Sequence, residues 1–286
     1  MKPMLLDDPA WPATFPHRVT PLDDEWLAGL LLRCDEVNHW SSGTTFRYLR
    51  QHSHHQERFG PRPHLIIVPA SILEGLAQLL LIPEGRLLAT TYQSELARLY
   101  GSPHPHGRLL STTFTFHLCP ACVAHTRHLK RTLMWPHLRY CPLHHIELRN
   151  KCHCGVALWP FSGKAMPFTC FACGLDWGSL PHRQVPRTLM RRERQLGCFY
   201  EYFLAEGTPR RMEYAAEILR QQQKDKSMLS WREHPKVIPY RKKFSLGYLV
   251  ERLVSVGVSV RDILPWELTR SSFVSTPTIL SETKSQ

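Results

Sequence analysis

The sequence has no apolar run long enough to cross a bilayer. Its longest candidates, such as Leu79 to Ile82, are cut short by a proline, whereas a membrane-spanning helix needs about 20 predominantly apolar residues. A signal peptide is also missing, because the opening MKPMLLDDPAWPATFP holds two aspartates and four prolines where an apolar core would stand. We therefore expect a cytoplasmic protein with no membrane partner, in which grouped cysteines indicate metal binding before disulfides.

The sequence also has few of the residues that common enzyme classes need. No GxxxxGKS/T phosphate-binding loop occurs, so any ATP chemistry must belong to a partner. Within residues 119–180 only Glu147 and Asp176 are acidic, which leaves no carboxylate cluster for a two-metal nuclease site. We therefore expect a protein that is not an enzyme and has no catalytic residues.

Acidic residues are scarce only in the middle of the chain. The net charge is +12 in total; residues 1–118 carry 10 Lys and Arg against 11 Asp and Glu, residues 119–180 carry 7 against 2, and residues 181–243 carry 15 against 7. A positive field concentrated in one region attracts polyanions, most commonly phosphate backbones. The alternative is a solvated basic surface with no specific partner.

Cysteine and histidine, in contrast, form four closely spaced pairs within one segment. They are Cys119 and Cys122, Cys141 and His144, Cys152 and Cys154, and Cys170 and Cys173. A two-residue gap lets both side chains of a tight turn point at one tetrahedral ion, and a closed zinc site needs two such turns. The eight ligands predict two structural Zn²⁺ per chain with no open coordination position. The remaining cysteines, Cys34 and Cys198, are predicted to be buried apolar residues.

Ligand spacing leaves the pairing of these turns open. In chain order, the first two turns would form a site of three cysteines and one histidine, and the last two an all-cysteine site. A crossed arrangement, as in RING modules, would join the first turn to the third and the second to the fourth. His145 and His153 adjoin ligand positions and are alternative ligands, although we expect them beside the sites or at the surface.

The pattern of apolar residues predicts a mainly α fold with small β zinc ribbons. An apolar helical face runs from Trp26 to Val37, with three acidic residues, Asp23, Asp24 and Glu25, placed to favour its N-terminus. A short helix carrying Phe46 would complete a helix-turn-helix-like pair. Further helices are expected over 71–82, opened by a capping box at Ser71, and over 92–100, 187–204, 210–223, 246–256 and 258–264, with a strand over 112–118 and a linker over 224–243.

These elements divide the chain into four parts. We expect an N-terminal helical, helix-turn-helix-like domain over 1–110, a double zinc-finger module over 111–180, a basic helical C-terminal domain over 181–270 and a disordered tail over 271–286. The arginines of the basic helices are candidate nucleic-acid contacts: Arg187, Arg191, Arg192, Arg194, Arg210 and Arg211.

The order of these motifs resembles the TniQ/TnsD family of transposon target-selection proteins. The resemblance rests on CPAC, then Trp135, then RYCPLHHIELRNKCHCG, then CFACG. The segment FPHRVTPLDDEWLAGLLLRCDEVN adds to it, with matching positions at Arg18, Pro21, Glu25, Trp26, Leu30 and Arg33. Two departures are the one-residue gap between Cys152 and Cys154 and the absence of the long C-terminal extension that DNA-reading members carry.

The resemblance implies a non-catalytic target-selection adaptor, most similar to the short TniQ proteins of CRISPR-associated transposons. Such a prokaryotic adaptor bridges a CRISPR effector complex with its guide RNA, or target DNA, to the AAA+ transposition regulator (TnsC-like), and associates with the nucleoid when it acts. Several family members are homodimers. The alternative function is an autonomous zinc-ribbon and helix-turn-helix protein that reads a DNA site, as a target selector or a transcription regulator.

Overall fold

The computed structural model describes residues 14–52, 65, 68–100, 116–135, 138–223 and 246–264. The helices are α1 (Leu27–Val37), α2 (Thr44–His52), α3 (Ala70–Leu80), α4 (Glu84–Leu88), α5 (Gln93–Tyr100), α6 (Pro120–Thr126), α7 (Met190–Glu206), α8 (Pro209–Gln223), α9 (Leu246–Ser255) and α10 (Val260–Ile263), with 3-10 turns η3 (Arg131–Met134) and η4 (Trp177–Ser179). None of the described helices has the length and apolar character that crossing a bilayer requires.

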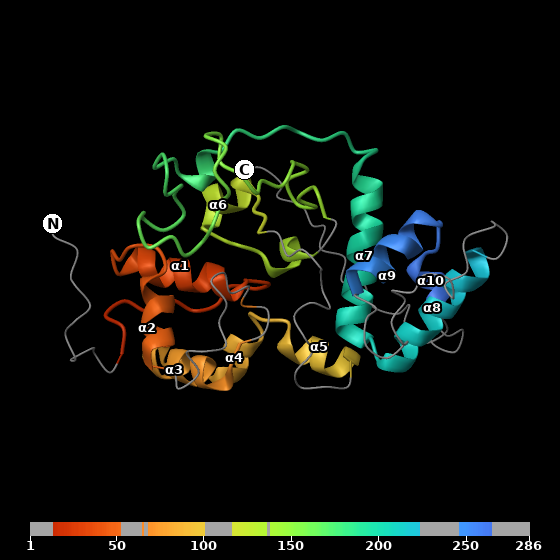
Figure 1. Cartoon of the computed structure of the whole chain (residues 1–286), viewed down its shortest axis with the longest axis horizontal. Helices are drawn as coiled ribbons and strands as arrows, with labels where there is room; N and C mark the ends of the chain where they lie inside the picture. Colours follow the sequence, from red (N-terminus) through yellow and green to blue (C-terminus); the bar gives the residue numbers. More distant parts are fainter. Residues whose placement is uncertain are drawn as a thin grey trace, which may run out of the picture.

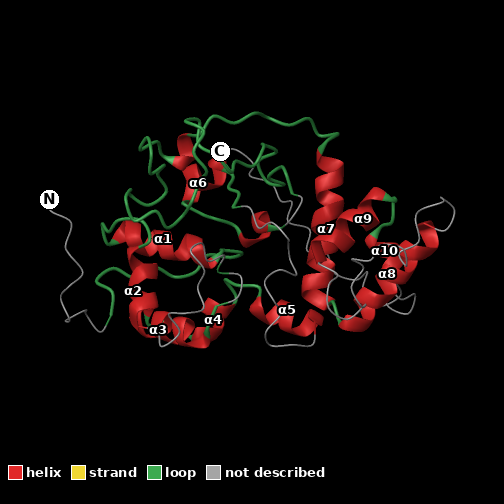
Figure 2. Cartoon of the chain, viewed as in Figure 1, coloured by secondary structure: helices red, strands yellow, loops and turns green. Residues whose placement is uncertain are grey.

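The helices gather at the two ends of the molecule, and the cysteine-rich segment lies above the first group (Figure 1). Helices α1 to α4 form one group and α7 to α10 the other, while α5 runs between them and packs against α7 and α8. The mainly α class is therefore confirmed. The described part of the cysteine-rich segment contains isolated β-bridges in place of the expected ribbons (Figure 2).

Helices α1 and α2 form the predicted pair, and the buried carboxylate of Asp35 holds the turn between them. Asp35 accepts hydrogen bonds from the backbone N–H of Gly43 at 2.7 Å, from the N–H of Thr45 at 2.8 Å and from the Thr45 hydroxyl at 2.6 Å. Gly43 has a φ of +82°, and a Cβ there would lie 3.0 Å from the Cα of Phe161. Asp35 therefore caps α2 from the preceding helix.

The acidic residues before α1 were expected to stabilise its first turn, and the structure gives them other partners. The helix begins at Leu27, and Glu25 accepts hydrogen bonds from Arg33 Nε at 2.8 Å and Arg33 Nη2 at 2.7 Å. Burial raises the pKa of Glu25, so this bidentate ion pair compensates for a costly buried charge. Asp24 has a φ of 57° and faces the cysteine-rich segment.

The predicted capping box at Ser71 is wrong. Helix α3 begins one residue earlier, at Ala70, with Pro69 in the N-cap position. The extended ψ of Pro69, 141°, starts the helix there and places Ser71 inside the first turn, where its hydroxyl is buried without a hydrogen bond. The predicted strand over 112–118 lies mostly outside the described residues; Leu118 forms a single bridge with Arg149.

The other predicted helices are present with shifted ends. Helix α7 begins at Met190, three residues after the predicted start at Arg187, while α5 and α8 agree with the predicted ranges within one residue. Helices α9 and α10 follow the expected pattern of helix, glycine turn and short helix, with Gly257 at a φ of +82°. The predicted linker over 224–243 and the tail over 271–286 lie outside the described residues.

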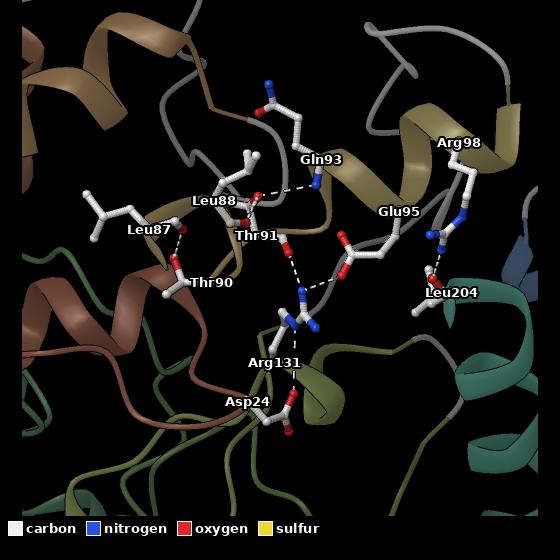
Figure 3. Close-up of polar contacts among 10 residues, drawn as sticks. All are labelled: Asp24, Leu87, Leu88, Thr90, Thr91, Gln93, Glu95, Arg98, Arg131 and Leu204. Atoms are coloured by element: carbon white, nitrogen blue, oxygen red, sulfur yellow. Dashed lines mark hydrogen bonds and ion pairs between the residues drawn. The ribbon is translucent and has the colours of Figure 1, made fainter. Parts of the chain in front are cut away.

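Arg131 joins the cysteine-rich segment to α5 and to the residues that precede α1 (Figure 3). Its guanidinium lies 2.6 Å from the Glu95 carboxylate of α5 and 3.7 Å from the Asp24 carboxylate before α1. The same group lies over the Tyr92 ring, 4.6 Å from its centroid. A second junction is the stacked pair of Trp135 and Tyr200, with ring centroids 4.9 Å apart. These contacts make the cysteine-rich segment part of one continuous core.

We expect replacing Asp35 by alanine to lower the free energy of unfolding by about 3 kcal/mol, because three buried donors would be left without an acceptor. Chemical denaturation of the zinc-loaded protein measures this. Asp23→Ala, which changes an exposed aspartate on the same side of the chain, is the matched control and should change stability by less than about 0.5 kcal/mol. Equal effects of the two substitutions would contradict the capping role.

The same variant should also change how stability depends on pH. Burial raises the pKa of Asp35 to about 7, although hydrogen bonds from Thr45 and Gly43 oppose the shift. Because the folded protein then holds this proton more tightly than the unfolded chain does, the contribution of Asp35 to stability is greatest near pH 4 and declines as the pH rises to about 7. The difference in stability between wild type and Asp35→Ala should therefore shrink over that interval.

Candidate metal centres

The first candidate metal centre, site 1, is formed by Cys119, Cys122, Cys141 and His144. Cys119 is the N-cap of α6 and Cys122 lies in its first turn, because Pro120 starts the helix directly after the first ligand. Cys141 and His144 lie in a turn that is closed by the hydrogen bond from Cys141 N–H to the carbonyl of Ile146 at 2.8 Å. His144 presents Nδ1 to the sulfur atoms, at 3.4, 3.3 and 3.6 Å.

These distances match a tetrahedral zinc site. Zinc binds cysteine sulfur at about 2.3 Å and histidine nitrogen at about 2.0–2.1 Å, so the edges of the tetrahedron should measure about 3.8 Å between sulfurs and about 3.6 Å between sulfur and nitrogen. The Sγ atoms of Cys122 and Cys141 lie 3.9 Å apart, close to the expected edge. The donor set and its spacing therefore fit Zn²⁺ bound through Nδ1 of the histidine.

Site 2 consists of Cys152, Cys154, Cys170 and Cys173. The Sγ atoms of Cys152 and Cys173 lie 3.5 Å apart, and those of Cys154 and Cys170 lie 3.7 Å apart. Each pair is followed by a glycine in the left-handed region, Gly155 at +85° and Gly174 at +72°. These glycines donate their N–H groups to the carbonyls of Cys152 and Cys170, at 2.9 and 2.8 Å. The glycines close both turns, and the one-residue gap does not prevent a four-sulfur cluster.

At site 1, hydrogen bonds between the cysteines favour the thiolate form of Cys141. Hydrogen bonds from the thiols of Cys119 and Cys122 hold the pKa of Cys141 well below its ordinary value, whereas Cys119 and Cys122 have raised pKa values. In site 2, burial raises the pKa of Cys170, but the amides of Ala172 and Cys173 and the neighbouring thiols together lower it to about 7. Zinc binds cysteine as the thiolate, and the lowered pKa of Cys141 and of Cys170 favours that form at one position in each cluster.

The ligands group in chain order, and the crossed arrangement is not the one that this structure adopts. Neither alternative histidine joins a cluster. His153 is exposed and its Nδ1 lies 3.5 Å from the Cys152 sulfur, while the backbone of His145 takes part in the site 1 turn through an N–H donated to the carbonyl of Cys141 at 2.9 Å. Cys34 is buried as predicted, but Cys198 is exposed because it lies on the outer face of α7.

The two sites are packed into one unit against the N-terminal helices. Helix α6 of site 1 packs on η4, which follows site 2, so closely that a Cβ on Gly178 would lie 2.8 Å from the Cα of Ala124. Arg127 pairs with Asp176 at 2.6 Å and with Glu36 of α1 at 3.2 Å. Asp176, one of the two acidic residues in the cysteine-rich segment, is therefore a structural ion-pair partner.

The six arginines expected to contact nucleic acid have different surroundings. Arg192 lies 3.4 Å from Glu251, and Arg211 lies 3.0 Å from Glu206, while Arg210 is exposed at the start of α8. The other three line a hollow of about 800 Å³ beside α7. Its lining consists of Arg187, Thr188, Arg191, Arg194, Gln195, Cys198, Phe199, Ser259, Val260 and Arg261.

Sequence reasoning missed one arginine of this hollow. Arg261 comes from the short helix α10, in a C-terminal segment with no net charge, residues 244–286. Only the packing of α10 against α7 brings it beside the others. A search for local charge clusters could not have found it.

Comparison with known protein families gives one match. Residues 16–148 match the family model named TniQ. The matched segment extends from before α1 to Leu148 and contains all four ligands of site 1, while the ligands of site 2 and helices α7 to α10 lie beyond its end. No curated protein matches the chain.

The purified protein is expected to contain two zinc ions per chain, one for each four-ligand cluster. His144→Ala and Cys173→Ser should each lower the content to one, because a site with only three of its four ligands binds zinc far more weakly. Elemental analysis of the desalted protein gives the count. Cys198→Ser, a cysteine outside both clusters, is the control and should leave two ions; a ligand variant that also keeps two would exclude that residue as a ligand.

Proposed function

Because the match over residues 16–148 supports membership of the TniQ family, which implies a role in target selection during transposition, we propose that this chain is a non-catalytic adaptor. It bridges a target-marking complex to the AAA+ transposition regulator, which is TnsC-like. The family match is the observation that carries this proposal. The target-marking complex is a CRISPR effector with its guide RNA, or target DNA itself.

The architecture suits a rigid bridge. Helices α1 to α4, within the TniQ-matching segment, and the α7 to α10 group stand at opposite ends of the molecule (Figure 1), and the cysteine-rich segment joins them through buried contacts. Glu193 of α7 accepts a hydrogen bond from the Arg139 N–H at 3.0 Å, in addition to the Arg131 and Trp135 junctions. An adaptor of this kind acts in the cytoplasm, associates with the nucleoid, and needs no catalytic residue of its own. A homodimer would double both contact surfaces.

The basic charge of residues 119–243 supports a contact between this chain and the nucleic acid of the target-marking complex. The net charge is +5 over residues 119–180 and +8 over residues 181–243. Arg210 and Arg211 lie at the start of α8, where Arg210 is exposed and the guanidinium of Arg211 lies over the Tyr202 ring, 5.6 Å from its centroid. We propose that these two arginines bind phosphate groups.

Capture experiments test the adaptor role. The zinc-loaded protein, immobilised, is expected to retain the AAA+ regulator and the guide-RNA complex encoded near it, and to retain both at once. The same protein with His144→Ala should retain less of both partners, because loss of a metal ligand affects the helical groups on both sides, whereas Cys198→Ser, outside both clusters, should retain them as the wild type does. Retention of neither partner, together with tight binding of one defined DNA duplex, would replace the adaptor role by that of an autonomous DNA reader.

A double variant tests phosphate binding by α8. Arg210→Gln with Arg211→Gln should weaken binding to the nucleic-acid component and lower the slope of log affinity against log salt by about 2, because each arginine that pairs with a phosphate adds about one to that slope. Fluorescence anisotropy over a salt series measures the slope. Arg86→Gln, on α4 at the other end of the molecule, is the control. An unchanged slope in the double variant would exclude these two arginines.

A further inference from the structure

The hollow between α7 and α10 combines two chemical features. Around it stand four guanidinium groups, those of Arg187, Arg191, Arg194 and Arg261. Between them lie apolar side chains, Phe199 and Val260, and the thiol of Cys198. Helices α9 and α10 pack against α7, and Figure 1 shows them on the same side of it. The hollow follows the N-terminal half of α7, where Arg191 and Arg194 lie about one helical turn apart, and Arg187 lies in the turn that leads into the helix.

Three arginines at and just before the start of α7 are available for a ligand. Arg187, Arg191 and Arg194 are all exposed, and none of them forms an ion pair with another part of the chain that the structure describes. The nearby acids are already engaged: Glu251 and Glu193 with Arg192, and Asp262 with the Ser259 hydroxyl and N–H at the start of α10. Three unpaired guanidinium groups along one wall create a local excess of positive charge.

The lining favours a peptide over a nucleic acid. Single-stranded nucleic acid is bound by exposed aromatic rings on which its bases stack, but the one aromatic ring in this hollow, Phe199, is only 1% exposed. A phosphate backbone alone would pair with the arginines and leave the partly exposed Val260 and the exposed Cys198 in contact with water. A peptide with an apolar side chain between carboxylates covers that surface and forms bidentate arginine pairs at the same time.

The volume agrees with this assignment. A hollow of about 800 Å³ falls within the range of about 300–1,000 Å³ that is typical of ligand pockets. It accommodates one or two apolar side chains of a peptide together with part of its backbone. From the lining, the charge and the size, we infer that the α7–α10 hollow is a docking site for an acidic segment of a partner protein, anchored by an apolar side chain.

This site is distinct from the phosphate-binding arginines proposed on α8. It lies in residues 187–261, beyond the segment that matches the TniQ family model, which ends at residue 148. Binding there requires neither the AAA+ regulator nor a guide complex. A peptide-binding assay therefore succeeds or fails independently of the adaptor role.

The test uses the full-length, zinc-loaded protein and a short fluorescein-labelled peptide with a central leucine pair between runs of aspartate and glutamate. Anisotropy should show saturable binding. Replacing the leucines by serines, or the acids by their amides, should each weaken binding about tenfold or more, since the anchor and the charged hydrogen bonds each contribute more than about 1.4 kcal/mol. Failure of the acidic peptide to bind would overturn the inference.

Variants of the protein locate the site. Arg191→Gln with Arg194→Gln should weaken peptide binding about tenfold or more, and Cys198→Trp should weaken it by filling the hollow from an exposed position. Arg86→Gln with Arg183→Gln removes the same charge from exposed positions elsewhere and should leave binding within about twofold. Zinc content and circular dichroism confirm that each variant is folded. Full binding by Cys198→Trp would place the peptide elsewhere and overturn the inference.

Cys198 also reports occupancy directly. The peptide should slow alkylation of Cys198 by a maleimide, followed by mass spectrometry of the proteolytic fragment that contains it, whereas a single-stranded oligothymidylate of similar charge should not. Protection by the oligonucleotide and not by the peptide would make the hollow a nucleic-acid groove and overturn the peptide assignment. Protection by neither would overturn it as well, since the hollow would then be a solvated surface.

Discussion

The tetrahedral closure of the two four-ligand clusters is the constraint on which the rest of the structure depends. Between residues 116 and 184 the described chain forms one short α-helix, two 3-10 turns and isolated β-bridges, so regular backbone hydrogen bonding holds little of it in place. Ligand atoms 3.3 to 3.9 Å apart would repel as thiolates without a shared cation. A Zn²⁺ ion held by each cluster would convert that repulsion into the main stabilisation of the segment.

The ordered clusters in turn position the helices on both sides. Phe161, which lies between the two turns of site 2, stacks on Phe46 of α2 with ring centroids 4.8 Å apart, and Arg131 connects Glu95 and Asp24 across the segment. Trp135 performs the same role toward α7 through Tyr200. A change at a metal ligand is therefore expected to be transmitted to both helical groups, because each rests on side chains whose position the clusters determine.

The division of the chain has a functional meaning. The family match covers the N-terminal helices and site 1, so this is the part of the chain that is similar to the TniQ family. Site 2 and helices α7 to α10 lie outside it, and the α7–α10 hollow with its arginines is in this part of the chain. The adaptor role proposed above requires one surface common to the family and another matched to a particular partner, and the separation of these two parts is compatible with that proposal.

The local chemistry of the sequence was sufficient to predict all eight metal-ligand candidates, the mainly helical class and most helices, because ligand spacing and apolar periodicity act over a few residues. Predictions from local sequence were wrong where contacts or backbone geometry outside the local pattern decide the structure. Glu25 pairs with Arg33 instead of stabilising the first turn of α1, and Ser71 does not cap α3, because Pro69 starts that helix. The grouping of ligands in chain order, the use of His144 Nδ1, the exposure of Cys198 and the contribution of Arg261 to the hollow were decided by tertiary packing, since each depends on which surfaces distant segments bring together.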